Sequence, residues 1–205
     1  MNCEKYRYKA EQQIWLQHIR IPYFHVIGKE DLKPPYEFKD KILYVKTADD
    51  YLSLPHKVIA AYEAIHKEYD YQYIFKTDDD QILTQPAFLD VLIDHLRSHK
   101  GIHYGGKVVR VLEDHISMYW QFHPELPQDV VVKKSEYCNG RFYLLSCDAV
   151  RALLSKKKKI AKEYFEDYAI GYYLDSFYKY PMFDFENDVF VDQGTGVKRP
   201  ESNDF

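Results

Sequence analysis

The sequence predicts an α/β domain in which a mostly parallel, Rossmann-like sheet is flanked by helices, with a less regular C-terminal half. Two observations support this fold class. Short apolar runs alternate with stretches of helical periodicity through the first half of the chain, the βαβα rhythm of a sheet covered by helices. The chain has 205 residues, of which 46% are hydrophobic, and this is enough to bury one sizeable core.

The first half contains three candidate strands and three candidate helices. The strands are short apolar runs at 23–27, which ends at Gly28, at 42–45 and at 71–75. The helices are expected at 8–19, after a capping Ser53, and from about Pro86. The apolar stripes of the last two helices consist of Val58, Ala61, Tyr62 and Ile65, and of Phe88, Leu89, Leu92 and Leu96. The stretch 29–39 contains two prolines and is expected to be a loop.

The second half is less regular. Candidate strands lie at 105–111, 117–122, 130–133 and 141–145, and candidate helices at 148–155 and 163–177. The dipeptide Asn139-Gly140 predicts a turn before the strand at 141–145. We expect one domain over residues 1–193, with the polar residues 194–205 as a tail or a linker to a further domain.

Composition excludes several classes of protein. The 28 basic and 32 acidic side chains give a net charge of −4, which argues against nucleic-acid binding. The 20 tyrosines suit the binding of sugars or bases, and equally the edge of a core. No apolar stretch approaches the roughly 20 residues of a membrane span. The three cysteines have no metal-binding spacing, so we expect a reducing, cytoplasmic location.

The sharpest functional signal is the acidic triplet Asp78-Asp79-Asp80, directly after the third candidate strand. Ligands of open α/β sheets gather at the carboxyl ends of strands. Adjacent carboxylates repel one another unless a cation neutralises them. Mg²⁺ and Mn²⁺ bind such oxygen ligands and leave positions for substrate phosphates. The triplet therefore favours a divalent metal site over the alternative, an acidic turn that caps the next helix.

Two further groups lie at comparable positions. Asp49 and Tyr51 follow the second candidate strand, and Lys57 lies one turn into the next helix. Together they suit a ribose or base and a phosphate, although a helix cap with a solvated lysine explains them better when they are taken alone. Glu166-Asp167 opens a candidate helix, whose dipole keeps a carboxylate ionised, as a general base requires. Helix starts are also simply rich in acidic residues.

Taken together, these segments resemble glycosyltransferase family 31, the β1,3-galactosyltransferase and Fringe type. Val26-Ile27-Gly28 is similar to the family's strand ending in Leu-Gly. Asp49 to Val58 resembles its Asp-Ser-Tyr-x-Asn-Leu-Thr-x-Lys-Thr stretch, and Lys76 to Asp80 matches its Lys-Thr-Asp-Asp-Asp box. Tyr137 to Ser146 resembles Tyr-x-x-Gly-x-Gly-Tyr-x-Leu-Ser, and Glu166 to Gly171 resembles Glu-Asp-Val-x-x-Gly. The five boxes follow the family order over most of residues 7–175.

The resemblance implies a GT-A fold and an enzyme that moves a hexosyl group from a UDP-sugar to a hydroxyl of a glycan or glycoprotein acceptor, with inversion, using Mn²⁺ or Mg²⁺. The residues implied to bind the donor are Gly28, Asp49, Tyr51, Lys57, Lys76, Asp78 and Asp79. The implied metal ligands are Asp78, Asp80 and a late aspartate, Asp188 or Asp192, since no His follows His123; we take Asp192. Asp167 is the implied general base.

The chain departs from the family in showing no membrane anchor and no set of luminal cysteines. A compact form of this kind resembles the N-terminal glycosyltransferase domains of proteins from large algal DNA viruses, the chloroviruses, which implies a location in the host cytoplasm. Two other functions stay open. A metal-dependent phosphohydrolase would use the same acidic cluster, and a non-catalytic sugar-binding module would explain the tyrosine content.

Overall fold

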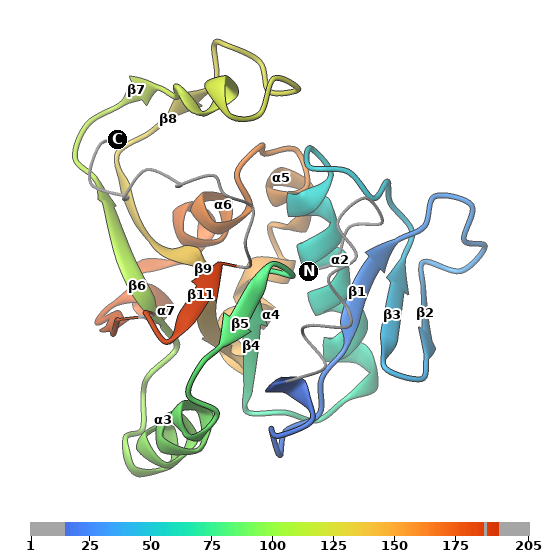
Figure 1. The fold of residues 1–205 in the computed structure, drawn as a ribbon. Helices are drawn as coiled ribbons and strands as arrows, with labels where there is room; N and C mark the ends of the chain where they lie inside the picture. Colours follow the sequence, from blue (N-terminus) through green and yellow to red (C-terminus); the bar gives the residue numbers. More distant parts are fainter. Residues whose placement is uncertain (1–14, 187, 193–205) are drawn as a thin grey trace.

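Two sheets form the centre of the fold that the computed structural model describes for residues 15–186 and 188–192 (Figure 1). The larger sheet has the strand order β10-β6-β9-β4, and the smaller one β1-β3-β2. Their strands are β1 (His25–Gly28), β2 (Tyr36–Lys39), β3 (Ile42–Val45), β4 (Tyr73–Thr77), β6 (Tyr104–Val111), β9 (Ser135–Ser146) and β10 (Phe183–Asp184). Two short antiparallel pairs join β5 (Gln81–Leu83) to β11 (Phe190–Asp192), and β7 (His115–Ile116) to β8 (Val131–Val132).

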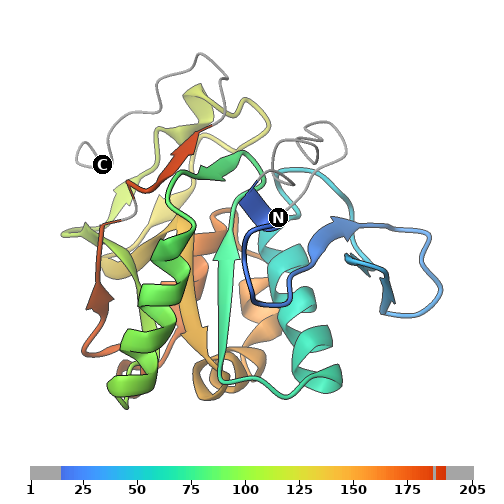
Figure 2. The ribbon, with the colours of Figure 1, turned by 60° about the horizontal axis from the view of Figure 1, so that its bottom comes forward.

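Helices cover both faces of the larger sheet (Figure 2). They are α2 (Leu54–Glu68), α3 (Ala87–Ser98), α4 (Cys147–Leu154), α5 (Lys157–Ile160), α6 (Glu166–Tyr173) and α7 (Ser176–Lys179), with a 3₁₀ turn, η2 (Tyr119–Gln121). Helix α2 packs against the smaller sheet and also against α4, α5 and α6, so it links the two halves of the fold. No helix in the described part of the chain is long and apolar enough to cross a membrane.

Strand β9 supplies side chains to two separate parts of the core, because successive side chains of a strand point to opposite faces. Tyr143 and Leu145 pack with α2, α4 and α6 on one face. Phe142 and Leu144 pack on the other face with the apolar stripe of α3, which is Leu89, Leu92 and Leu96. All four of these β9 residues are at most 2% exposed, so β9 is the central strand of the domain.

The prediction of a mostly parallel sheet is wrong. Within the described residues, β1 with β3 and β6 with β10 are parallel, whereas β9 runs antiparallel to both β4 and β6. The error came from the segment 137–141, which was expected to be a turn and instead lies inside β9. A strand that continues through this segment returns between β4 and β6, and this makes the larger sheet mixed.

Several smaller predictions also need correction. The expected loop at 29–39 contains β2, which forms a hairpin with β3. The expected strand at 117–122 is instead the turn η2. The expected helix at 163–177 is broken, because Leu174 has extended backbone angles between α6 and α7.

Other elements agree with the sequence. The strands expected at 23–27, 42–45 and 71–75 correspond to β1, β3 and β4, and the helix after Pro86 is α3. Ser53 occupies the N-cap of α2 without a capping bond from its side chain; its own N–H donates to Asp50 Oδ1 over 2.7 Å. The predicted tail 194–205, and the predicted helix 8–19 except for its last five residues, lie outside the described residues.

Glycine at position 171 allows α6 to approach β9 closely. A Cβ atom on Gly171 would lie 2.3 Å from Tyr137 Cβ and 2.7 Å from Tyr137 Cα. We therefore expect Gly171→Ala to lower the free energy of unfolding by about 2 kcal/mol, the usual cost of overpacking. Urea denaturation followed by circular dichroism measures this cost.

Gly101→Ala is the comparison variant. Gly101 has a φ of +88° and no atom within 4 Å of an added Cβ, so it reports backbone strain without overlap, at about 1 kcal/mol. An equal or smaller cost for Gly171→Ala would contradict the close approach of α6 and β9.

Candidate active site

A change of register in β9 creates the centre of the candidate site. Gly106 of β6 pairs with Tyr143, but Val108 pairs with Cys138, so residues 139–142 of β9 lie opposite Lys107 alone. Such bulges re-aim the backbone next to binding sites. Here the bulge takes the Asn139–Arg141 backbone away from β6, and Asn139 Oδ1 accepts from the Arg141 N–H over 2.9 Å.

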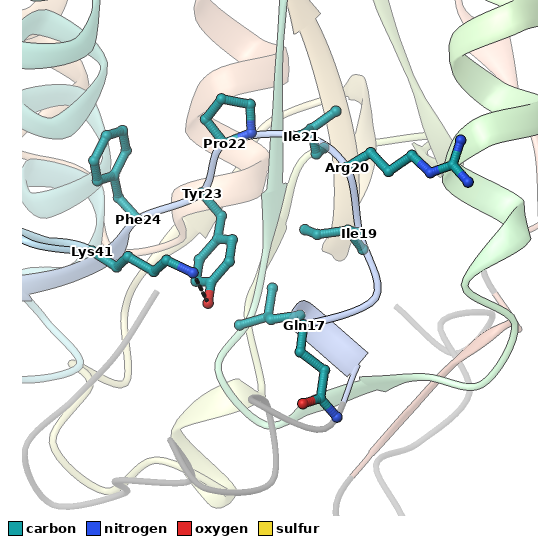
Figure 3. Close-up of a pocket in the computed structure, with 9 residues that line it drawn as sticks. Gln17, Ile19, Arg20, Ile21, Pro22, Tyr23, Phe24 and Lys41 are labelled. Carbon is teal, nitrogen blue, oxygen red and sulfur yellow. Dashed lines mark hydrogen bonds between the residues drawn. The ribbon is translucent and has the colours of Figure 1, made fainter.

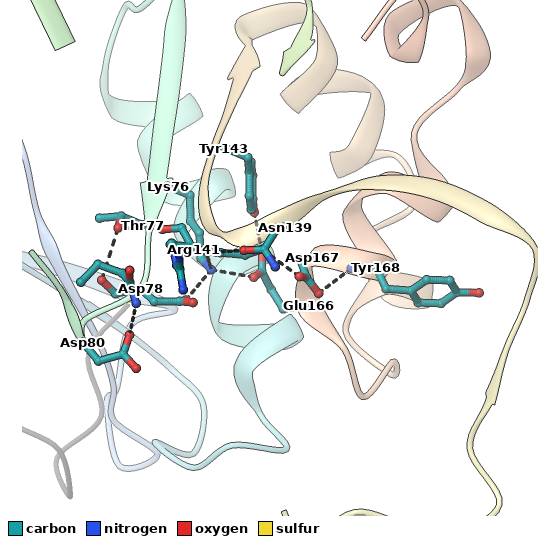
Figure 4. A network of polar contacts seen from close by, with 12 residues as sticks. Lys76, Thr77, Asp78, Asp80, Asn139, Arg141, Tyr143, Glu166, Asp167 and Tyr168 are labelled. Atoms are coloured by element: carbon teal, nitrogen blue, oxygen red, sulfur yellow. Dashed lines mark hydrogen bonds and ion pairs between the residues drawn. The ribbon is translucent and has the colours of Figure 1, made fainter. Parts of the chain in front are cut away.

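Lys76, near the end of β4, joins three elements at this point (Figure 4). Its ammonium is 2.6 Å from Asp78 Oδ1, 2.9 Å from Glu166 Oε2, and donates to the carbonyl of Gly140 over 2.8 Å. The residue is only 5% exposed. Burial opposes the charged form, but the carboxylates of Asp78 and Glu166 outweigh it and raise the pKa of Lys76 above its ordinary value. Lys76 is therefore a buried cation shared by β4, the β9 bulge and α6.

A buried chain of hydrogen bonds extends from Glu166 into the core. Tyr143 donates its hydroxyl hydrogen to Glu166 Oε1, and the hydroxyls of Tyr143 and Tyr62 are 2.7 Å apart. Burial, and then the charge of Glu166, raise the pKa of Tyr143 well above the ordinary value, so it remains a donor. These bonds hold the Glu166 side chain at the start of α6 and so help to position the next residue, Asp167.

Asp167 contacts the N–H of Gly140, the residue whose carbonyl contacts Lys76. Its Oδ2 accepts from the Gly140 N–H and its Oδ1 from the Tyr168 N–H, each over 2.8 Å. Loss of contact with water, and then the negative charge of Glu166, raise the pKa of the Asp167 carboxyl to about 6. A half-buried carboxylate with a pKa near neutrality is suited to accept a proton as a general base.

The acidic triplet occupies the turn between β4 and β5, and its three residues are half-buried. Asp80 Oδ1 accepts from Gln81 Nε2 over 2.9 Å, and Thr77 Oγ1 donates to the Arg141 carbonyl over 2.9 Å. The β5–β11 register places the backbone of Asp192 opposite Gln81, next to the end of the triplet. Across 15–186 and 188–192, no three His, Cys, Asp or Glu side chains come together as ligands for one metal ion.

Gly28, Asp49 and Lys57 come together at the ends of β1 and β3. Asp49 Oδ1 accepts from the Gly28 N–H over 3.0 Å and from Lys57 Nζ over 2.6 Å. A Cβ atom on Gly28 would lie 2.4 Å from the Ala48 carbonyl oxygen, so glycine is needed for this approach. The Lys57 side chain is 2% exposed and is held by Asp49. The prediction that it contacts a phosphate stays a prediction.

Tyr51 contacts a part of the chain to which the sequence assigned no role. The ring of His123 stacks on that of Tyr51, with centroids 3.9 Å apart, and on the ring of Tyr119 at 5.1 Å. His123 and Tyr119 belong to residues 112–134, which we call the β7–β8 segment. The segment also contacts the start of α6, where the Tyr119 ring packs against that of Phe165, so it links α6 to the residues that follow β3.

A separate pocket lies near the start of the described chain. It is lined by Leu16, Gln17, residues 19–24 and Lys41, and Lys41 Nζ donates to the Tyr23 hydroxyl over 3.0 Å (Figure 3). It contains none of the predicted site residues. The residues predicted from the sequence instead gather at strand ends and at the β9 bulge.

The structure thus forms two groups from the predicted residues. Lys76, Asp78 and Asp167 are joined through Gly140, and Gly28, Asp49 and Lys57 are joined directly. Sequence reasoning missed the parts played by Glu166, Gly140, Tyr143 and His123. The only available signal was the Glu166-Asp167 pair, whose first carboxylate is the buried partner of Lys76.

Comparisons with known proteins give one family. A family model described as galactosyltransferase matches residues 10–178. A search of curated proteins gives no match.

The shared cation makes Lys76 important for stability. Lys76→Met would leave the Glu166 carboxylate, whose side chain is 3% exposed, buried without a counter-charge. We expect the free energy of unfolding to fall by about 3 to 5 kcal/mol, measured by urea denaturation. The double variant Lys76→Met/Glu166→Gln should recover part of this loss, because it removes both charges.

Lys67→Met is the control, since Lys67 forms an exposed ion pair with Glu63 one helical turn away. We expect a change below about 1 kcal/mol for this variant. Similar costs at positions 67 and 76 would show that Lys76 is not the buried counter-charge described above.

Proposed function

Because the chain belongs to the galactosyltransferase family and is therefore a glycosyltransferase, we propose that it moves a hexosyl group from a UDP-sugar to a hydroxyl of a glycan acceptor, with inversion, on a GT-A-like fold. The family description favours galactose as the first sugar to test. The kinship with chlorovirus enzymes and the cytoplasmic location stay predictions from the sequence.

One observation carries the proposal: the acidic triplet and Asp167 are joined through two residues. Lys76 binds Asp78 and the Gly140 carbonyl, while the Gly140 N–H binds Asp167. Donor binding and proton removal must occur side by side for direct transfer between two substrates. A short, buried connection between a metal-binding candidate and a general-base candidate supports this arrangement.

The acidic triplet suits a divalent metal. Asp78 and Asp80 would hold Mn²⁺ or Mg²⁺, with Asp192 as the third candidate ligand, since these ions bind carboxylate oxygens and keep positions for phosphates. When bound, the ion supplies a Lewis acid that stabilises negative charge on the leaving diphosphate. Lys76 has three protein partners, so we assign it to positioning Asp78 rather than to contact with the donor.

The group formed by Gly28, Asp49, Tyr51 and Lys57 is proposed to bind the nucleoside. Gly28 and Lys57 hold the Asp49 carboxylate in one orientation, and a fixed carboxylate accepts hydrogen bonds from ribose hydroxyls. Tyr51 would form the adjacent wall, supported by the His123 ring that stacks on it. Asp79, in the turn after β4, would face the donor with its two neighbours.

Asp167 is proposed as the general base. Its carboxylate takes the proton of the acceptor hydroxyl while that oxygen forms a bond to the anomeric carbon. The bond between the anomeric carbon and the diphosphate breaks on the opposite face, and the UDP leaves with the bonding electrons. The hydrogen bonds from Gly140 and Tyr168 hold the base in place throughout.

Metal-dependent binding of UDP tests the proposed donor site. We expect calorimetry to show UDP binding with Mn²⁺, and at least about tenfold weaker binding without it or in Asp80→Asn, because one charged ligand is lost. Asp90→Asn, an exposed change on α3, is the matched control and should bind as the wild type does. Equal UDP affinity with and without Mn²⁺ would remove the metal from the proposal.

The raised pKa of Asp167 predicts the pH dependence of transfer. The base must be deprotonated, so kcat/KM with UDP-galactose should fall as the pH drops through about 6, the pKa of this carboxyl in the protein without substrate. Asp167→Asn should bind UDP normally and transfer at least about 100-fold more slowly. Transfer by this variant at the wild-type rate would assign the base to another group.

A further inference from the structure

The β7–β8 segment exposes an unusual amount of apolar surface. Five of its large apolar side chains are 47% to 77% exposed. They are Leu112, Ile116, Met118, Phe122 and Val131. Ile116 and Val131 are direct cross-strand partners, so their side chains stand on the same face of the ribbon. A two-stranded ribbon in water normally keeps such a face covered.

Folding of the segment does not require this outer face. On the inner side of the ribbon, Val132 packs with Val111 and Tyr168. Leu126, in the same segment, is also buried, at 4% exposed. The Lys133 N–H also donates to the Tyr168 hydroxyl over 3.0 Å. About half or more of each of the five side chains is exposed and available to a ligand.

The exposed face continues directly from the candidate active site. The Tyr119 ring packs edge-on against Phe165, with centroids 5.8 Å apart, and Phe165 immediately precedes Glu166 and Asp167. Met118 precedes Tyr119 in sequence, and the Phe122 ring lies 5.9 Å from the Tyr119 ring. In Figure 1 the segment lies above α6.

The same segment also reaches the proposed donor side, because His123 stacks on both Tyr119 and Tyr51. A molecule bound to the segment therefore lies beside the expected positions of both the donor and the acceptor. The acceptor hydroxyl must come to Asp167, and the rest of the acceptor extends over whatever surface adjoins that residue. Here that surface includes Met118 and Phe122, whose side chains are both 47% exposed.

We propose that the β7–β8 segment is an acceptor-binding surface, and that the acceptor is a glycoside whose sugar is attached to an alkyl group, as in a glycolipid. The proposal rests on the proposed transferase function and adds to it the class of acceptor. The alkyl group packs on Met118, Phe122 and the Ile116–Val131 pair, while the sugar extends toward Asp167. Burial of methylene groups supplies the affinity.

Binding of short glycosides tests the proposal without a need for turnover. Octyl and methyl β-galactoside, both below the micelle concentration, are titrated calorimetrically into protein that holds UDP and Mn²⁺. We expect the octyl compound to bind at least about tenfold tighter than the methyl compound. The variant Met118→Ser/Phe122→Ser should reduce this preference to less than about twofold, with UDP affinity unchanged.

Val91→Ser is the matched control, because Val91 is 68% exposed on α3, away from the segment. It should keep the full octyl preference, which separates the proposed surface from detergent-like adsorption. Equal affinity for the two glycosides in the wild type, or an octyl preference kept in the double variant, overturns the proposal.

Two further readouts separate the remaining explanations. Sedimentation of the wild type and the double variant tests whether a second copy of the chain covers this face, and a dimer that the double variant dissolves overturns the proposal. Failure of the wild type to bind UDP counts against the proposed function itself. With UDP bound, the octyl-to-methyl ratio alone decides the class of acceptor.

Discussion

The ammonium of Lys76 is the interaction on which the arrangement of the site depends. It is buried and has two carboxylate partners and a carbonyl partner, from the turn after β4, from α6 and from the β9 bulge. A charge taken out of water at this depth is tolerated only when its partners surround it. Glu166 in turn depends on the cation, since it is 4% exposed. Removal of Lys76 would leave the Glu166 carboxylate buried without its counter-charge.

The second constraint is geometric and comes from β9. A regular antiparallel strand would direct the Gly140 N–H and C=O along the sheet, to β4 or β6. The bulge releases this residue from β6, so its carbonyl meets Lys76 and its N–H meets Asp167. There is little room for a side chain, because a Cβ on Gly140 would lie 3.2 Å from Asp167 Oδ2. The backbone of Gly140 thus sets the distance between the Lys76 ammonium and the Asp167 carboxylate.

Local chemistry made part of this predictable from the sequence. Asp78 to Asp80 follow an apolar run, and strand ends can be recognised from a few neighbouring residues. Asn139-Gly140 was interpreted as a reversal of the chain, and the local signal is real, since Asn139 Oδ1 accepts from the Arg141 N–H as in a turn. The chain nevertheless continues as a strand on both sides, because β4 and β6 supply partners that no local pattern reveals. The pairing of Lys76 with Glu166 was unpredictable for the same reason.

The order of strands in the larger sheet also determines when the protein can fold as it is synthesised. In the described strands β4 pairs with β9, and β6 pairs with β9 and β10. Strands β4 and β6 can therefore pair only after the later residues of β9 and β10 have been synthesised. Until Ser146 has left the ribosome, β4 has no strand at its side, and until Glu166 has followed, Lys76 lacks one of its carboxylates. Sheets closed by such distant pairings form slowly and expose unpaired edges meanwhile. The nascent chain therefore completes the candidate site only after residues 166 and 167 have been made, when Asp167 and the Glu166 partner of Lys76 arrive together.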